Sequence, residues 1–253
     1  MDIDIKYEDL LSGDYISLEG IGLIRSPLLE EMRPTSGIGW DTYYRFLYFM
    51  RISTSQYLKL INKENTSVGL YKEIVSNELV RELFEKAFSF FMYETVIFSI
   101  EANSFLCLRE KPNDGDNTKS YYVHGVITED NFDDIRAAIL IMNYIPISKT
   151  DIKTKHSSKE SEDAWNKIQA FLDENSKSDE VDENMTIGNL LSKLCAIHPS
   201  INFLNVFKLT VFQFYDTFFQ TSYMRSISFN EQIVSNHGSN DFKYSDWIKP
   251  IES

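Results

Sequence analysis

Three short runs of alternating apolar residues lie between residues 96 and 127 and constrain the fold more than any other feature of the sequence. The runs are Val96-Phe98-Ile100, then residues 105–109, then residues 121–127. Alternation with a period of two is typical of strands that bury one face. A turn at Asp114-Gly115 would join the second and third runs, so the segment predicts a three-stranded antiparallel meander.

Helical periodicity surrounds this meander on both sides. Residues 77–93 place Val80, Phe84, Ala87 and Phe91 on one helical stripe, with charged residues opposite. After the meander, Thr128 or Asp130 can cap a helix. Its stripe consists of Phe132, Ile135, Ile139 and Met142. The chain is therefore predicted to be α+β and predominantly helical, with the small antiparallel sheet packed by helices.

The N-terminal part adds a β-rich segment and further helices. Residues 15–24 are enriched in β-branched and aromatic residues, and Ser26-Pro27 is a typical helix start that predicts a short helix through Met32. Asp41 can cap another helix, and one more begins near Ser53 or Thr54.

Charged and polar residues separate two predicted regions. Residues 148–163 are almost free of apolar side chains and carry both signs of charge, so we expect a flexible linker. The sequence therefore predicts an α+β domain at 1–147 and a helical C-terminal region at 164–253. A short stripe at Trp165, Ile168 and Leu172 begins that second region.

Two helices are predicted towards the C-terminus. Thr186 can cap the first, and Asn205 can cap a second over 205–223. The second helix has an unusually broad aromatic arc, which must be buried against the chain's own core or against an apolar helix of a partner. The candidate partner-binding residues on it are Phe207, Val211, Phe214, Tyr215, Phe218 and Phe219.

Charge and composition exclude several classes of protein. The net charge of −13 opposes binding to nucleic-acid backbones or anionic membranes. No apolar run is long enough to span a membrane, and the acidic first fifteen residues do not resemble a secretory signal. The two cysteines, Cys107 and Cys195, are too few and too far apart for a disulfide scaffold.

No motif assigns a catalytic, cofactor or metal site. Cys195 and His198 supply only two of the four ligands that zinc needs. The acids around Asp114-Gly115 lack the order of a calcium loop, and neither glycine-rich phosphate-binding pattern occurs. An enzyme would instead need a dispersed site, for which the candidates are Glu94, Glu101, Cys107, His124, Asp133 and Asp134.

The order of several phrases resembles a known group of phage proteins. These phrases are GDYISLEGIGLIRSPLLEEM, YYRFLYFM, GVITEDNFDDIRAAILIMN and LTVFQFYDTFF, followed by an Asp-Trp pair at Trp247. The layout is similar to tail-assembly-chaperone-like proteins from the tail-morphogenesis region of long-tailed phages and prophages of Gram-positive bacteria.

The resemblance implies a non-enzymatic protein of the host cytoplasm that binds and solubilises the tape-measure protein during tail assembly. The expected partner is the tape-measure protein or another phage tail protein, with no nucleic acid, membrane or cofactor involved, and a homo-oligomer is compatible with it. The alternatives are a structural component of the virion, such as a tail or baseplate subunit, and the enzyme with a dispersed carboxylate or Cys/His site.

Overall fold

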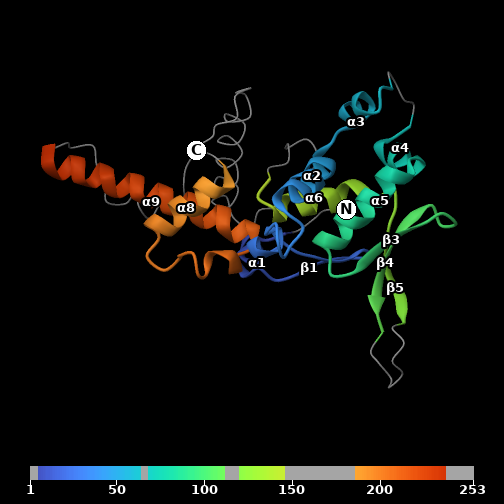
Figure 1. The fold of residues 1–253 in the computed structure, drawn as a ribbon, viewed down its shortest axis with the longest axis horizontal. Coiled ribbons are helices and arrows are strands. Elements are labelled where there is room, and N and C mark those ends of the chain that lie inside the picture. The colour runs from blue at the N-terminus through green and yellow to red at the C-terminus, as the bar shows by residue number, and fades with distance from the viewer. Residues whose placement is uncertain (1–4, 64–67, 112–119, 146–185, 238–253) are drawn as a thin grey trace.

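The computed structural model describes residues 5–63, 68–111, 120–145 and 186–237. The predicted linker 148–163, the turn at Asp114-Gly115 and the helical stripe at Trp165 lie outside the described residues. The described part confirms the predicted α+β class, with one two-stranded sheet, one three-stranded antiparallel sheet and many helices (Figure 1).

The N-terminal elements form a hairpin and a set of short helices. In chain order they are α1 (Tyr7–Ser12), β1 (Ile16–Leu18), β2 (Gly22–Ile24), the 3-10 helix η1 (Leu29–Met32), α2 (Trp40–Arg51) and α3 (Thr54–Leu60). The helix predicted to begin near Ser53 or Thr54 is confirmed, and the Ser53 hydroxyl caps it by accepting a hydrogen bond from the Gln56 N–H.

The helix predicted to start at Ser26-Pro27 begins later, at Leu29. Residues 27–29 are instead paired with the segment before α9, because the Leu29 N–H donates to the Leu209 carbonyl at 2.9 Å. Leu28 also forms an isolated antiparallel bridge with Thr210. This tertiary pairing uses the backbone groups of the expected first helical turn.

The central elements contain the meander and the helices that cover it. They are α4 (Leu70–Ser76), α5 (Glu78–Phe91), β3 (Thr95–Ser99), β4 (Ser104–Glu110), β5 (Tyr121–Ile127) and α6 (Phe132–Met142). The predicted helix over 77–93 is confirmed, with Asn77 as its cap, and α4 is an additional helix that we did not predict. The strand order β3-β4-β5 is that of the predicted antiparallel meander.

A β-bulge divides strand β5. Cys107 is the register partner of Gly125, whereas the next residue, Leu108, is the partner of Val123, so His124 is the extra residue. Gly125 and Ile127 therefore face the core, while Tyr121 and Val123 lie on the opposite face. The simple alternation that we read over 121–127 does not continue through the bulge.

The N-terminal hairpin packs on the sheet at a glycine. The Val126 N–H donates to the Gly20 carbonyl at 3.0 Å. A Cβ atom at Gly125 would lie only 2.1 Å from the Ile21 carbonyl oxygen, so only glycine permits this approach.

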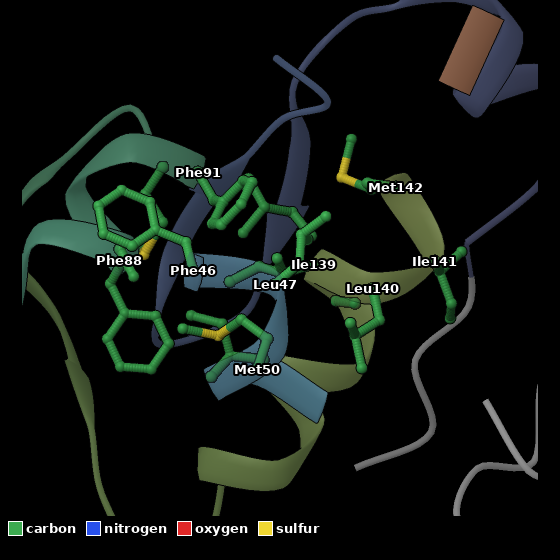
Figure 2. Close-up of a cluster of buried hydrophobic side chains, with 14 of the residues drawn as sticks. Phe46, Leu47, Met50, Phe88, Phe91, Ile139, Leu140, Ile141 and Met142 are labelled. Atoms are coloured by element: carbon green, nitrogen blue, oxygen red, sulfur yellow. The ribbon is translucent and has the colours of Figure 1, made fainter. Parts of the chain in front are cut away.

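The main core lies between α2, α5 and α6. Figure 2 shows Phe46, Leu47 and Met50 of α2 gathered with Phe88 and Phe91 of α5 and with Ile139 and Leu140 of α6. The buried Arg136 of α6 donates to the Ile52 carbonyl at 2.5 Å, which links α6 to the end of α2.

The C-terminal elements continue this core. They are α8 (Ile187–Ile197), the 3-10 helix η3 (Val206–Lys208) and α9 (Val211–His237). The first turns of α9 contribute Val211, Phe212 and Phe214 to the same contiguous core as the N-terminal elements. Within the described residues, no helix combines the length and the apolar content that crossing a membrane requires.

Candidate partner-binding region

The N-terminus of α9 is fixed by four hydrogen bonds. Thr210 and Gln213 form a reciprocal pair: the Gln213 N–H donates to Thr210 Oγ1, and the Thr210 N–H donates to Gln213 Oε1. The Val211 N–H donates to the Pro27 carbonyl and the Phe212 N–H to Ser26 Oγ. All four amides that a helix leaves unpaired at its start are therefore satisfied.

This arrangement corrects the predicted start of the helix. We expected a continuous helix from Asn205, but α9 begins at Val211, and Phe207 lies in the separate turn η3. Thr210 forms the bridge with Leu28, which requires an extended backbone and ends the preceding turn. The pattern Thr-x-x-Gln at 210–213 is a capping-box signal that could have located the true start.

Three of the six predicted partner-binding residues are buried in the chain's own core. The exposed fractions are 1% for Val211, 0% for Phe214 and 9% for Phe218. Side chains this deeply buried are not accessible to a partner in this conformation.

The other three predicted residues are half-buried and each has an internal partner. Tyr215 and Phe219 both stack on Tyr144, with ring centroids 5.7 Å apart in each case. The guanidinium of Arg33 lies 4.1 Å from the ring centre of Phe207. Their contact with another protein stays a prediction, and only their outer edges are available for it.

A buried carboxylate joins α9 to α1. The Tyr7 hydroxyl donates to Asp216 Oδ1 at 2.7 Å, and Asp216 is only 7% exposed. Burial raises the pKa of Asp216 above its ordinary value, and the hydrogen bonds from Tyr7 and Gln220 oppose this rise. The pKa of Tyr7 is also raised, first by burial and then by the charge of Asp216.

The loop between α8 and η3 exposes two adjacent apolar side chains. Leu204 is 90% exposed and Phe203 is 64% exposed. Our reading of the sequence did not single them out, although two asparagines, Asn202 and Asn205, flank them as turn residues do.

Hydrogen bonds hold this loop in a defined shape. The Asn202 N–H donates to Asn205 Oδ1, the Leu204 N–H donates to Asn202 Oδ1, and Asn205 Nδ2 donates to the Ser200 carbonyl. The backbone is therefore ordered by its own side chains while Phe203 and Leu204 remain in solvent. A preordered apolar pair loses little conformational entropy when it binds, which favours a role in protein contact.

The second half of α9 extends beyond the core. In Figure 1 this red helix continues past α8, at the end of the molecule opposite the three-stranded sheet. Met224 is 42% exposed and Phe229 is 62% exposed, whereas Ile227 is only 9% exposed.

The Cys195–His198 pair does not form part of a metal site in the described residues. The Nδ1 atom of His198 accepts hydrogen bonds from the Ser200 and Ile201 amides, which shapes the start of the exposed loop. Nowhere in the described ranges do three or more His, Cys, Asp or Glu side chains gather as metal ligands would.

Three of the residues considered for a dispersed catalytic site lie near one another: Glu94, Cys107 and His124. The Glu94 side chain is fully buried, forms an ion pair with Arg109, and accepts a hydrogen bond from the Leu23 N–H at 3.0 Å. His124 Nε2 lies 3.9 Å from Glu94 Oε1. Burial, together with the nearby Glu94 charge, raises the pKa of the Cys107 thiol to about 12, so the reactive thiolate is scarce at neutral pH.

The remaining acidic candidates lie elsewhere. Glu101 is exposed in the turn between β3 and β4, and Asp133 pairs with Arg136 on α6. Asp134 occupies the first turn of the same helix.

The contacts of Glu94 hold the N-terminal hairpin against the sheet, and a Cβ at Gly22 would lie 2.5 Å from Glu94 Oε2.

Comparison with known proteins finds a family model that matches the C-terminal part of the chain. Residues 175–252 match the family model of the YomV second domain, a phage-derived protein family. This span contains α8, the exposed loop, η3 and α9. Neither the curated proteins nor the solved structures contain a match to this chain. The similarity associates the C-terminal part of the chain with phage proteins.

Proposed function

We propose that the chain is a non-enzymatic phage tail-assembly chaperone, which binds the tape-measure protein in the host cytoplasm and keeps it from aggregating. The observation that carries this proposal is the similarity of residues 175–252 to a phage-derived family. The resemblance in the order of sequence phrases, which covers most of the chain, supports the role in tail assembly.

The surface of the matched region supports protein binding. Phe203 and Leu204 expose 64% and 90% of their surface in a loop that hydrogen bonds hold in place. Exposed apolar groups on an ordered scaffold are typical of protein contact sites. The net charge of −13 would keep a complex with an apolar partner dispersed, because like-charged particles repel each other.

Co-expression with the tape-measure protein of the same phage or prophage tests the proposal. We expect the tape-measure protein to move from the pellet to the supernatant and to co-purify with the chain. A double change, Phe203→Ser with Leu204→Ser, should weaken co-purification. Leu79→Ser on α5, where the side chain is 78% exposed, is the matched control. If the tape-measure protein stays insoluble with the wild-type chain, the proposed function is wrong.

Mass spectrometry of purified particles separates the chaperone from a structural component of the virion. A chaperone leaves the assembly and should be absent from mature particles. A stoichiometric amount of the chain in particles would instead identify a tail or baseplate subunit.

A further inference from the structure

In the described part of the chain, one face of the three-stranded sheet carries several exposed apolar side chains. We call it the outer sheet face; its apolar residues are Ile97, Leu106, Leu108, Tyr121, Val123 and Val126, and the register also places Thr95, Ser99 and Glu110 on it. Ile97 is 42% exposed, Tyr121 47% and Val123 50%. An antiparallel sheet with one face in solvent normally carries polar residues on that face. The exposed apolar side chains of the outer sheet face therefore require an explanation.

The register places these side chains together. Leu106 lies between Ile97 of β3 and Val126 of β5, and Leu108 lies beside Val123. Tyr121 follows as the partner of Glu110. The bulge at His124 is what turns Tyr121 and Val123 to this face, and it thereby extends the apolar surface along β5.

The strand edges beside this face already have partners at several positions. The Val96 N–H donates to Ser89 Oγ, and the Phe98 N–H donates to Glu85 Oε1, both from α5. On the other edge, the Val126 N–H donates to the Gly20 carbonyl. A partner would therefore use the face of the sheet more readily than add a strand to it.

We propose that the outer sheet face binds one amphipathic helix of a partner protein, with an apolar stripe two to three turns long. Three strands about 4.8 Å apart give a face about 10 Å wide, which is about the diameter of one helix. The inner face gives a precedent, because α5 packs there with Phe88 against Phe105 of β4.

Size argues against a second copy of the chain as the occupant. Half-exposed side chains of this kind offer on the order of 100 Å² each, so Ile97, Tyr121 and Val123 together offer on the order of 300 Å². A stable protein dimer buries about 800 Å² on each partner. A single helix needs less area.

The charge of this chain indicates which residues should flank the apolar stripe of the bound helix. Glu110, the register partner of Tyr121, places a carboxylate at one end of the outer sheet face, and the chain as a whole carries −13. A helix with Lys or Arg beside its apolar stripe would approach this molecule favourably. The inference rests on the proposed function only for the identity of the partner as the tape-measure protein, and its docking chemistry is tested separately.

A model helix tests the docking directly. The probe is a fluorescein-labelled 18-residue peptide of Leu and Lys with Leu at i, i+3, i+4 and i+7, titrated with the full chain in fluorescence anisotropy at physiological salt. We expect Val123→Asp to weaken binding at least tenfold, and the isosteric Val123→Thr, which keeps the strand propensity, to weaken it about threefold. Leu79→Asp should change it less than twofold.

The controls separate folding and charge from docking. Circular dichroism and thermal unfolding identify any variant that does not fold, and a peptide with Ala in place of Leu has the same charge but no apolar stripe. The inference is overturned if the Ala peptide binds equally well, if the Leu peptide does not bind, or if Leu79→Asp weakens binding as much as Val123→Asp. A change of oligomeric state in Val123→Asp by analytical ultracentrifugation would also overturn it in favour of self-association.

Co-expression distinguishes this inference from the proposed function. If the wild-type chain and Val123→Asp solubilise the tape-measure protein equally, the function stands and the outer sheet face is not its binding site. If the model helix binds as expected but the tape-measure protein stays insoluble, the docking face stands and the function is wrong.

Discussion

At the scale of single residues, Asp216 places a carboxylate in the contact between α9 and α1. The two hydrogen-bond partners that the described residues give it are neutral. Its partners are the Tyr7 hydroxyl and the Gln220 side chain, both of which can be retained by a neutral acceptor. Because the pKa of Asp216 is raised in the folded chain, the folded state binds more protons than the unfolded state in a pH interval that begins near the ordinary pKa of 3.8 and extends above it. Stability contributed at this position therefore falls as the pH rises through that interval.

The change Asp216→Asn should stabilise the protein at neutral pH, because it removes the cost of a buried charge and keeps the oxygen that accepts from Tyr7. Each unit of pKa shift corresponds to about 1.4 kcal/mol, and the gain should vanish below about pH 4, where the carboxylate is protonated in both states. Urea unfolding at pH 7 and pH 4 measures this.

A matched variant tests the cause. Tyr7→Phe keeps the ring but removes the donor, so it should destabilise the chain at pH 7 by about 1 kcal/mol. If Asp216→Asn is less stable than the wild type at pH 7, the carboxylate is held by a favourable interaction and burial is not its dominant influence.

At the scale of elements, the Thr210 hydroxyl group is one of the acceptors that cap the start of α9. Thr210 Oγ1 accepts from the Gln213 N–H at 3.1 Å, and Thr210 itself is 3% exposed, so no water replaces this contact easily. The same residue pairs with Leu28, which couples the helix start to the N-terminal segment.

The change Thr210→Ala should lower the free energy of unfolding by about 1 kcal/mol, since it leaves a helix amide unpaired. Thr210→Ser keeps the hydroxyl and should cost less than half as much. Thermal unfolding monitored by circular dichroism compares the two, and equal losses for Ala and Ser would contradict the capping role.

At the scale of the whole molecule, the described residues have one contiguous core rather than two. Val211, Phe212 and Phe214 of α9 pack with side chains that come from the first 145 residues. Tyr144, which follows α6, stacks on Tyr215 and Phe219. The predicted boundary at residues 148–163 separates the chain in sequence, while the two sides share a core.

A chain shortened to residues 1–147 should therefore fold poorly, because it exposes the apolar surface that α9 covers. We expect aggregation, or a melting temperature at least 10 °C below that of the full chain, as burial of several aromatic side chains is lost. Expression of the two chains side by side, with differential scanning calorimetry, measures this. A shortened chain that unfolds at the temperature of the full chain would show that residues 1–147 are an independent domain.

The sequence by itself determined the local elements. The alternation at 96–109 and the stripe through Phe84 and Phe91 depend only on near neighbours, because burial of one face imposes the periods of strand and helix. Caps such as Ser53 and Asn77 are equally local, since the side chain bonds to an amide three residues away.

Only the tertiary structure decided which surfaces remain open. The bulge at His124 turns Val123 outward, and pairing of Leu28 with Thr210 moves the start of α9 to Val211. Both depend on contacts between segments far apart in the chain, which a periodic pattern does not encode. The aromatic arc of α9 was recognisable in the sequence, which left open whether it is buried against the chain's own core or against a partner, and the exposed pair Phe203-Leu204 was not recognisable.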